Sequence, residues 1–145
     1  MLKTPYLLFL GDAPDQLAAK VAQGIKDWRP EFSRGQLRLP GCKADLGLTE
    51  MTIAEAKAAG ARTLVVGAAN RGGLISDAWI ATLIEAIEAG FDIASGLHNL
   101  LRERSELVEA AKNASVALYD VRVPTVAYPI ADGKKRSGKR CLAVG

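Results

Sequence analysis

The stretch that decides the fold reads Thr63-Leu-Val-Val-Gly-Ala-Ala-Asn70-Arg71-Gly72-Gly73. Its first four residues suit a β-strand, and three of them are fully apolar. A short apolar run without polar alternation is typical of a strand buried on both faces of a parallel sheet. Glycines, an asparagine and an arginine follow it, and Ser76 then opens a helical pattern. We therefore expect strand, loop and helix, with the loop at the sheet edge where α/β proteins bind ligands.

Similar patterns precede and follow this stretch. Further strands are predicted over residues 6–10, 36–39, 91–95 and 116–119, the last running on into Asp120. The alternation of strands and helices with short loops predicts an α/β fold, Rossmann-like, with a mostly parallel five-stranded sheet and helices on both faces.

Four helical patterns lie between the strands. In the first, apolar residues recur at near-helical spacing until Pro30 ends the pattern: Leu17, Val21, Ile25 and Trp28. In the second, Thr52 and Glu55 match a capping box, and Gly60 ends the helix. Ser76 and Ser105 are the expected caps of the third and fourth. The third helix ends at Gly90 and has its apolar residues on one broad face. These residues are Trp79, Ile80, Leu83, Ile84 and Ile87.

Composition and charge exclude several classes of protein. The 145 residues suit one aliphatic domain, and no apolar run approaches the roughly 20 residues of a membrane helix. The start of the chain has no secretory pattern, so the expected compartment is the cytoplasm. Cys42 and Cys141 are isolated and expected to be reduced.

The net charge of +3 comes from five basic residues between 134 and 140. The rest of the chain has 14 basic and 16 acidic residues, so its net charge is slightly negative. Neither a nucleic acid nor a membrane is an expected partner.

The loop after the first strand lacks the dinucleotide fingerprint. It reads Gly11-Asp12-Ala13-Pro14-Asp15, without G-x-G-x-x-G. Two carboxylates near a helix N-terminus compete for the positive end that would attract a pyrophosphate. Asp12 is interpreted as a helix cap or as a ligand for an amine or hydroxyl. Gly11 and Asp12 are the candidate cofactor contacts, and NAD-dependent oxidoreduction is disfavoured.

The loop after the strand at residues 63–66 holds the candidate substrate-binding residues Asn70, Arg71, Gly72 and Gly73. Glycines permit close backbone approach, and a following helix end attracts anions. In the alternative interpretation, the glycines only turn the chain and Arg71 is solvated. Both interpretations stay open.

Two further loops contribute candidates. Gly96 and His98 follow the strand at residues 91–95, and His98 is the only histidine. Its ordinary pKa lies near neutrality, so it suits a general base, although a lone histidine also serves as a hydrogen-bonded structural residue. Asp120 and Arg122 alternate across Val121, so they either pair with each other or together hold a zwitterion such as an amino acid. We expect Gly72, His98 and Arg122 to gather along one rim of the sheet. No metal site is predicted.

Taken together, these motifs resemble a bacterial family of conserved hypothetical proteins, some of which are described as D-glutamate N-acetyltransferases. Its members pair an N-terminal Rossmann-like domain with a C-terminal P-loop domain. The resemblance covers nearly the whole chain and is most specific in Ser95-Gly-Leu-His98 and Asp120-Val-Arg122. The other matching segments are Thr52-Ile-Ala-Glu-Ala56, Ala59-Gly-Ala61, Leu64-Val-Val-Gly67, Gly72-Gly73, Trp79, Glu85-Ala86 and Ala89-Gly90.

The resemblance implies a domain division and a chemistry. Residues 1–133 would form the Rossmann-like domain, and residues 134–145 a basic linker with the first strand of a P-loop domain that is not present. The full-length protein would transfer acetyl from acetyl-CoA to an acidic D-amino acid, and this part alone would be inactive. His98 or Asp120 would be the catalytic base, and Arg71 and Arg122 would hold substrate carboxylates. The P-loop domain would bind the phosphates of CoA or of a nucleotide. A homo-oligomer is expected, and the alternative is a non-catalytic binding or oligomerisation module.

Overall fold

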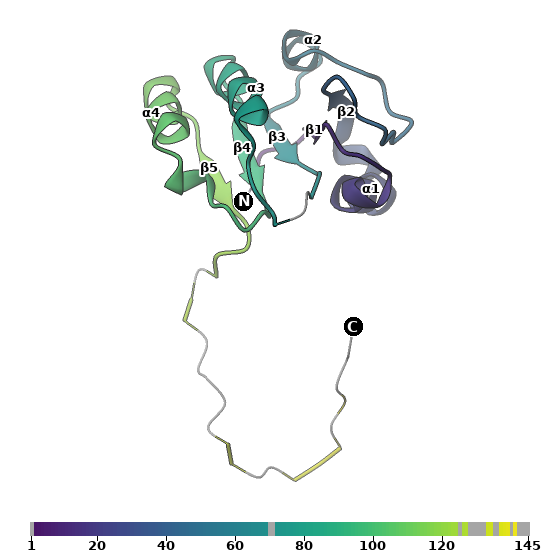
Figure 1. Cartoon of the computed structure of the whole chain (residues 1–145), viewed down its shortest axis with the longest axis vertical. Helices are drawn as coiled ribbons and strands as arrows, with labels where there is room; N and C mark the ends of the chain where they lie inside the picture. The colour runs from purple at the N-terminus through teal and green to yellow at the C-terminus, as the bar shows by residue number, and fades with distance from the viewer. Residues whose placement is uncertain are drawn as a thin grey trace.

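The structure is a computed structural model, and it describes residues 2–69, 72–124, 126–127, 133–134, 137–139 and 141. Five parallel strands form one sheet in the order β2-β1-β3-β4-β5 (Figure 1). Their bounds are β1 Tyr6–Gly11, β2 Ser33–Arg38, β3 Thr63–Val66, β4 Asp92–Ser95 and β5 Leu118–Asp120. The predicted five-stranded parallel α/β sheet is confirmed, although β2 begins three residues earlier than expected and β5 two residues later.

Helices cover both faces of this sheet. Figure 1 shows α2, α3 and α4 in a row along one side and α1 on the other. The helices are α1 (Lys20–Trp28), α2 (Ile53–Ala58), α3 (Asp77–Glu88) and α4 (Ser105–Ala114), with short 3-10 helices η1 (Leu17–Ala19), η2 (Pro30–Phe32) and η3 (Leu101–Glu103). None of the helices in the described ranges is long and apolar enough to cross a membrane.

The α3 side of the core is built from large side chains. Trp79 and Phe9 are both fully buried and meet edge to face, with ring centroids 5.5 Å apart. The predicted apolar face of α3 is confirmed for Trp79, Ile80, Leu83 and Ile87, and Ala86 is buried with them, whereas Ile84 is only partly buried.

The α1 side of the core is built from small side chains, and here the sequence pattern misleads. Leu17, Val21 and Trp28 were expected on the buried face, but they are 73%, 46% and 84% exposed. Ala19 and Ala22 are buried instead. A Cβ atom at Gly67 would lie 2.3 Å from the Cβ of Ala22, so α1 approaches the end of β3 too closely for larger residues. Of the four predicted residues, only Ile25 packs against the core, where it is partly buried.

Helix ends follow the predictions in part. The capping box of α2 is confirmed: the Glu55 amide donates to the Thr52 hydroxyl at 3.2 Å, and the Thr52 amide donates to the Glu55 carboxylate at 2.8 Å. Ser76 is the N-cap of α3, but its hydroxyl makes no capping hydrogen bond. Ser105 is the first residue of α4 rather than its cap, because η3 comes directly before it and Arg104 takes the N-cap position.

A buried carboxylate ties the amino ends of the strands together. Asp92 begins β4 with a side chain only 2% exposed, and Lys3 Nζ lies 2.9 Å from its Oδ2. The amide of Ala117 donates to its Oδ1 at 2.9 Å. The hydroxyl of Thr63 in turn donates to the carbonyl of Lys3 at 2.6 Å. This network fixes the N-terminal segment and β5 on β4, at the sheet edge opposite the loops described next.

Candidate functional site

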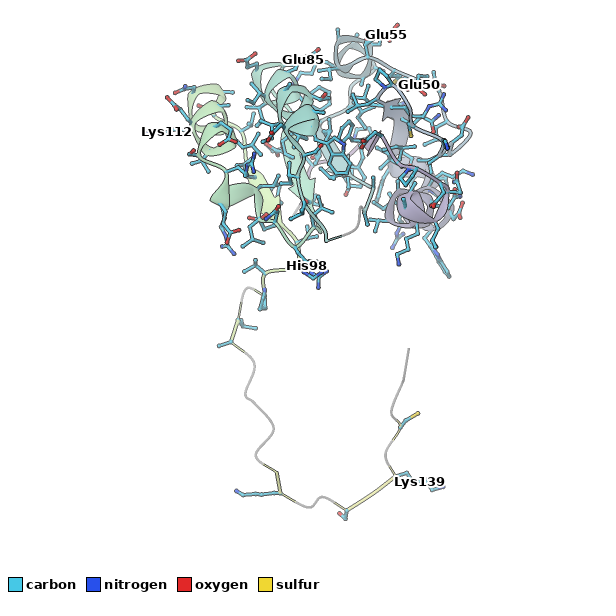
Figure 2. The ribbon with its side chains drawn as sticks, in the orientation of Figure 1. Glu50, Glu55, Glu85, His98, Lys112 and Lys139 are labelled. Atoms are coloured by element: carbon cyan, nitrogen blue, oxygen red, sulfur yellow. The ribbon has the colours of Figure 1, made fainter. Side chains whose placement is uncertain are left out.

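The carboxyl ends of β3, β4 and β5 lie next to one another. The sheet register pairs Val66 with Ser95, and Ser95 with Asp120. The loops that follow these strands therefore leave from one edge, as expected for a parallel sheet. Figure 2 shows His98 at this edge, at the opposite end of the domain from Glu55 and Glu85. The loops that hold Gly72, His98 and Arg122 therefore lie at one edge of the sheet, and their use as one binding site stays a prediction.

Gly73 and His98 are in direct contact between the first two of these loops. Gly73 is buried and has φ +63°, and a Cβ atom there would lie 2.8 Å from His98 Cδ2 and 3.0 Å from the His98 amide nitrogen. The amide of Asn99 donates to the Gly73 carbonyl at 3.0 Å, and the side chain of Asn99 accepts from the Ile75 amide at 3.3 Å. These bonds fix the backbone that carries His98. Asn99 was not predicted, and its only signal in the sequence is its place after the histidine.

The imidazole of His98 is exposed at this rim. Within the described part of the chain, the ring has no hydrogen-bond or ionic partner. Its backbone is held by Gly73 while its ring stays accessible to a small molecule. This combination suits a residue that exchanges a proton with a bound ligand.

The third loop places Arg122 in a turn. Val121 donates its amide to the Ser95 carbonyl at 3.0 Å, and Val123 donates to the Asp120 carbonyl at 3.1 Å. A Cβ atom at Gly96 would touch Val121 at an ordinary 3.5 Å, so the loops after β4 and β5 lie side by side with room for a methyl group between them. Arg122 is exposed and forms no ion pair with any described residue. Its guanidinium is therefore available to an anion.

Asp120 is held by η3 rather than by Arg122. Its Oδ1 accepts the Leu101 amide at 2.6 Å, and its Oδ2 accepts the Arg102 amide at 3.4 Å. Arg102 Nε lies 3.6 Å from the same Oδ2, and the Asp120 side chain is 7% exposed. The prediction that Asp120 pairs with Arg122 is wrong, because β5 ends at Asp120 and the following turn breaks the expected alternation. These contacts favour His98 over Asp120 as a base.

The loop after β1 is packed against α3. The indole Nε1 of Trp79 donates to Asp12 Oδ1 at 2.8 Å, and a Cβ atom at Gly11 would lie 2.5 Å from the Trp79 ring. The N-cap position of η1 is taken by Gln16, and the carboxylate of Asp15 accepts the Ala18 amide at 2.8 Å. The interpretation of Asp12 as a helix cap is therefore wrong. Asp12 is exposed, and its Oδ2 is the atom left for a ligand, so the cofactor role of Gly11 and Asp12 stays a prediction.

Other candidates lie outside this arrangement. Asn70 and Arg71 fall outside the described residues, as does most of the expected final strand, and their roles stay predictions. Gly72 has φ +87° and only ordinary contacts with Leu74. Within the described ranges, no three His, Cys, Asp or Glu residues are grouped to hold a metal ion.

One cation near the loop after β1 was not predicted. Arg38 ends β2, and its Nε lies 2.6 Å from Glu50 Oε2. The hydrogen bond to Glu50 raises the pKa of the Arg38 guanidinium, and the charge of Asp45 adds to the shift. Because two carboxylates surround it, Arg38 holds the segment of Glu50 on the outer edge of β2 rather than presenting a free charge.

The fold and this edge define a Rossmann-like α/β domain whose first loop lacks the dinucleotide fingerprint. The chain belongs to the family described as a domain of unknown function, DUF1611_N, a Rossmann-like domain, and residues 37–124 match it. A DUF1611 family protein from Anabaena variabilis has a crystal structure that superimposes with a TM-score of 0.69 at 19% identity, over 90% of this chain and 40% of that one. That likeness supports the fold.

Two curated relatives carry the same name. A protein of Tritonibacter scottomollicae is 68% identical over all of this chain, and a protein of a Pseudoalteromonas species is 45% identical over 99% of it. Both are named D-glutamate N-acetyltransferase. The chain spans 44% and 43% of their lengths, which is less than half of each.

Proposed function

We propose that this domain forms the acidic amino-acid site of an N-acetyltransferase that acts on D-glutamate or a similar D-amino acid, with acetyl-CoA as donor. Two things support the proposal: the name carried by both curated relatives, and the contact that holds the backbone of His98 while its imidazole stays exposed. The contact with Gly73 and the exposed ring are the observations on this chain that support His98 as the base. The activity is proposed for the full-length protein.

The reaction needs a base and an amine. An ammonium group must lose a proton before its nitrogen attacks the thioester carbonyl; the amide bond then forms, the C–S bond breaks, and the leaving CoA thiolate takes up the second proton that the nitrogen gives up. In the proposal, the imidazole of His98 accepts the ammonium proton. Asp120 is a positioning residue, because its contacts with Leu101 and Arg102 fix η3 beside the loop of His98.

The substrate would be held through its carboxylates. Arg122 offers an exposed guanidinium on the same rim, and such a group binds a carboxylate through charge-assisted hydrogen bonds. Arg71 is the second proposed carboxylate ligand, with Asn70, Gly72, Gly73 and Gly96 shaping the loops around the substrate. In the longer protein, a C-terminal P-loop domain would bind the phosphates of CoA or of a nucleotide. Gly11 and Asp12 are the proposed cofactor contacts on this side.

The test is acetylation of D-glutamate by the full-length enzyme carrying single substitutions. His98→Ala should lower kcat by about 100-fold or more, the usual range for a lost general base. Arg122→Ala should raise KM for D-glutamate by roughly 10-fold or more, the loss of one charged hydrogen bond. Arg62→Ala is the matched control, because Arg62 is exposed and precedes β3 at the opposite edge of the sheet. Wild-type rates in both site variants, with folding intact, would refute these assignments.

The second candidate function is a non-catalytic module for binding or oligomerisation that positions the P-loop domain. It is favoured by the engagement of Asp120, Asp12 and Gly11 in internal contacts. Calorimetry of this 145-residue chain with D-glutamate, acetyl-CoA and ATP separates the two functions. A module that only positions its neighbour gives no heat with any of the three ligands, whereas a substrate site gives heat with D-glutamate.

A further inference from the structure

The 3-10 helix η1 and the helix α1 that follows it directly carry an apolar stripe on their solvent side. Leu17, Val21 and Trp28 are 73%, 46% and 84% exposed, and Gly24 lies among them with no atom within 4 Å of its Cβ position. We call these four residues the α1 stripe. Val21, Gly24 and Trp28 belong to α1, where spacings of three and four residues keep them along one line, and Leu17 lies in the adjoining η1. A tryptophan this exposed, aligned with a leucine and a valine, is a feature of interaction surfaces.

The fold does not need this stripe. The core side of this segment is made by Ala19 of η1 and by Ala22 and the partly buried Ile25 of α1, and the close approach at Gly67 fixes α1 against the end of β3. Polar residues at Leu17, Val21 and Trp28 would serve the domain equally well. The stripe therefore calls for a partner outside this domain.

We propose that the partner is a second copy, with the two α1 helices packed antiparallel about a two-fold axis. The order of side-chain sizes along the stripe suits this pairing. Trp28 of one copy would lie over Leu17 of the other, and Val21 and Gly24 would meet near the axis, where the missing side chain lets the helices approach. A two-fold contact uses the same patch on both copies, so one stripe supplies both halves of the interface.

Charge along the stripe specifies the antiparallel direction. Lys20 and Asp27 are seven residues apart on one flank of the stripe, and both are exposed. In an antiparallel helix pair, the same flank of each helix faces the other, so Lys20 of each copy meets Asp27 of the other. Within its own chain, Asp27 Oδ1 accepts a hydrogen bond from Gln23 Nε2 at 2.8 Å and lies 3.6 Å from Lys26 Nζ, whereas Lys20 has no ionic partner among the described residues. Two reciprocal ion pairs would thus border the apolar contact.

The contact is small. A single pair of helices, about three turns each, falls at the low end of interface sizes, where association is weak and reversible. We therefore expect a concentration-dependent monomer–dimer equilibrium of this chain. The inference does not depend on acetyl transfer, because α1 carries none of the residues proposed for catalysis.

Sedimentation velocity of the 145-residue chain over a range of concentrations is the first test. The wild type should shift from monomer to dimer, and Trp28→Glu should remain monomeric. Val108→Glu is the matched control, because Val108 is an exposed valine on α4, and it should dimerise like the wild type. A wild type that is monomeric throughout, or a Trp28→Glu variant that still dimerises, would overturn the proposal.

Charge exchange tests the direction of pairing. Lys20→Glu and Asp27→Lys should each weaken the dimer by roughly 10-fold, since each places like charges opposite each other. The double variant Lys20→Glu/Asp27→Lys restores both ion pairs and should recover the wild-type dissociation constant. A double variant weaker than either single variant would refute the antiparallel arrangement.

Cross-linking gives a second measurement that needs no change in the stripe. In a chain with Cys42→Ser and Cys141→Ser, mixing a Lys20→Cys variant with an Asp27→Cys variant should give the mixed disulfide dimer under oxidising conditions. Little of either homodimeric disulfide is expected, because an antiparallel pair separates Lys20 from Lys20 by about two turns. Homodimeric disulfides as the main product would contradict the proposal.

Discussion

Gly73 and His98 touch across the loops that follow β3 and β4, with no room between them for a side chain on Gly73. The Asn99 amide, one residue beyond the histidine, donates to the carbonyl of the same glycine. The position of the histidine at the sheet edge is therefore set by a residue that has no chemistry of its own. Predictions about the site follow from this contact, and predictions about stability follow from the packing beneath it.

Gly73→Ala should disturb His98 specifically. The new methyl group would lie 2.8 Å from His98 Cδ2 and 3.0 Å from its amide nitrogen, so the loop must move. In the full-length enzyme we expect acetylation of D-glutamate to fall by about 10-fold or more, as a 1 Å misplacement of a reacting group can cause. Steady-state kinetics with D-glutamate measures the effect.

Gly72→Ala is the matched control for that substitution. Both glycines have positive φ, so both alanine variants carry a similar backbone cost of about 1–2 kcal/mol. A methyl group at Gly72 meets only the Leu74 side chain at 3.5 Å. Equal losses of activity in the two variants would show that backbone strain, and not the His98 contact, is responsible.

Gly67→Ala should destabilise the whole domain. The added methyl group would lie 2.3 Å from the Ala22 Cβ, and relief requires α1 to move off the sheet. Overpacking of this kind costs about 1–3 kcal/mol. Urea unfolding measures it, and Ala22→Gly in the same chain should restore part of the loss by removing the opposing methyl group. If the two substitutions are simply additive, the two residues are not in contact.

The capping box of α2 should make stability depend on pH. Hydrogen bonds from the Thr52 amide and, to a smaller extent, from the Thr52 hydroxyl hold the pKa of the Glu55 carboxylate below its ordinary value. A carboxyl whose pKa is lower in the folded state stabilises the fold above its unfolded pKa, and that stabilisation is lost as the pH falls through the folded pKa.

Glu55→Gln should therefore reduce the loss of stability on acidification. The amide keeps an acceptor for the Thr52 N–H but does not titrate. Urea unfolding at about pH 6 and about pH 3 measures the difference, and the variant should lose less than the wild type between the two. A variant with the same pH dependence as the wild type would show that Glu55 makes no contribution.

Asp92→Ala should cost more stability than Lys3→Ala. Asp92 is buried and accepts the Ala117 amide as well as the ion pair, so its removal leaves a buried donor and a cation without partners. Breaking a buried pair in this way costs about 3–5 kcal/mol. Lys3 is half-exposed, and its charge can be solvated by water. Thermal unfolding of both variants gives the order, and a larger loss for Lys3→Ala would contradict it.

The sequence predicted the sheet well because buried strands are recognisable as short apolar runs. Thr63–Val66 and Tyr6–Gly11 are apolar runs bounded by glycine, and the capping box at Thr52 and Glu55 is a local pattern with a local cause. The buried face of α1 was predicted wrongly because it is determined by the contact between Ala22 and Gly67. That contact depends on how closely α1 packs against the end of β3. No local pattern distinguishes an alanine needed at close approach from any other alanine.

The site could be predicted only as a set of loops. Parallel strands place their carboxyl ends together, so the shared rim of Gly72, His98 and Arg122 follows from fold class alone. The partners of Asp120 could not be predicted, because η3 carries no signal in the sequence and the turn at Arg122 replaces the expected extended chain. Trp79 looked like an ordinary core residue, and its indole contact with Asp12 joins segments 67 positions apart.

The most direct test of the proposed substrate site is an NMR titration of this chain with D-glutamate. We predict that amide signals shift in the loops after β3, β4 and β5, with the largest changes at Gly73, Gly96, His98 and Arg122. The signals of Lys3, Arg62 and Asp92 at the opposite edge should stay in place. Shifts confined to that opposite edge, or no shifts at saturating ligand, would contradict the assignment.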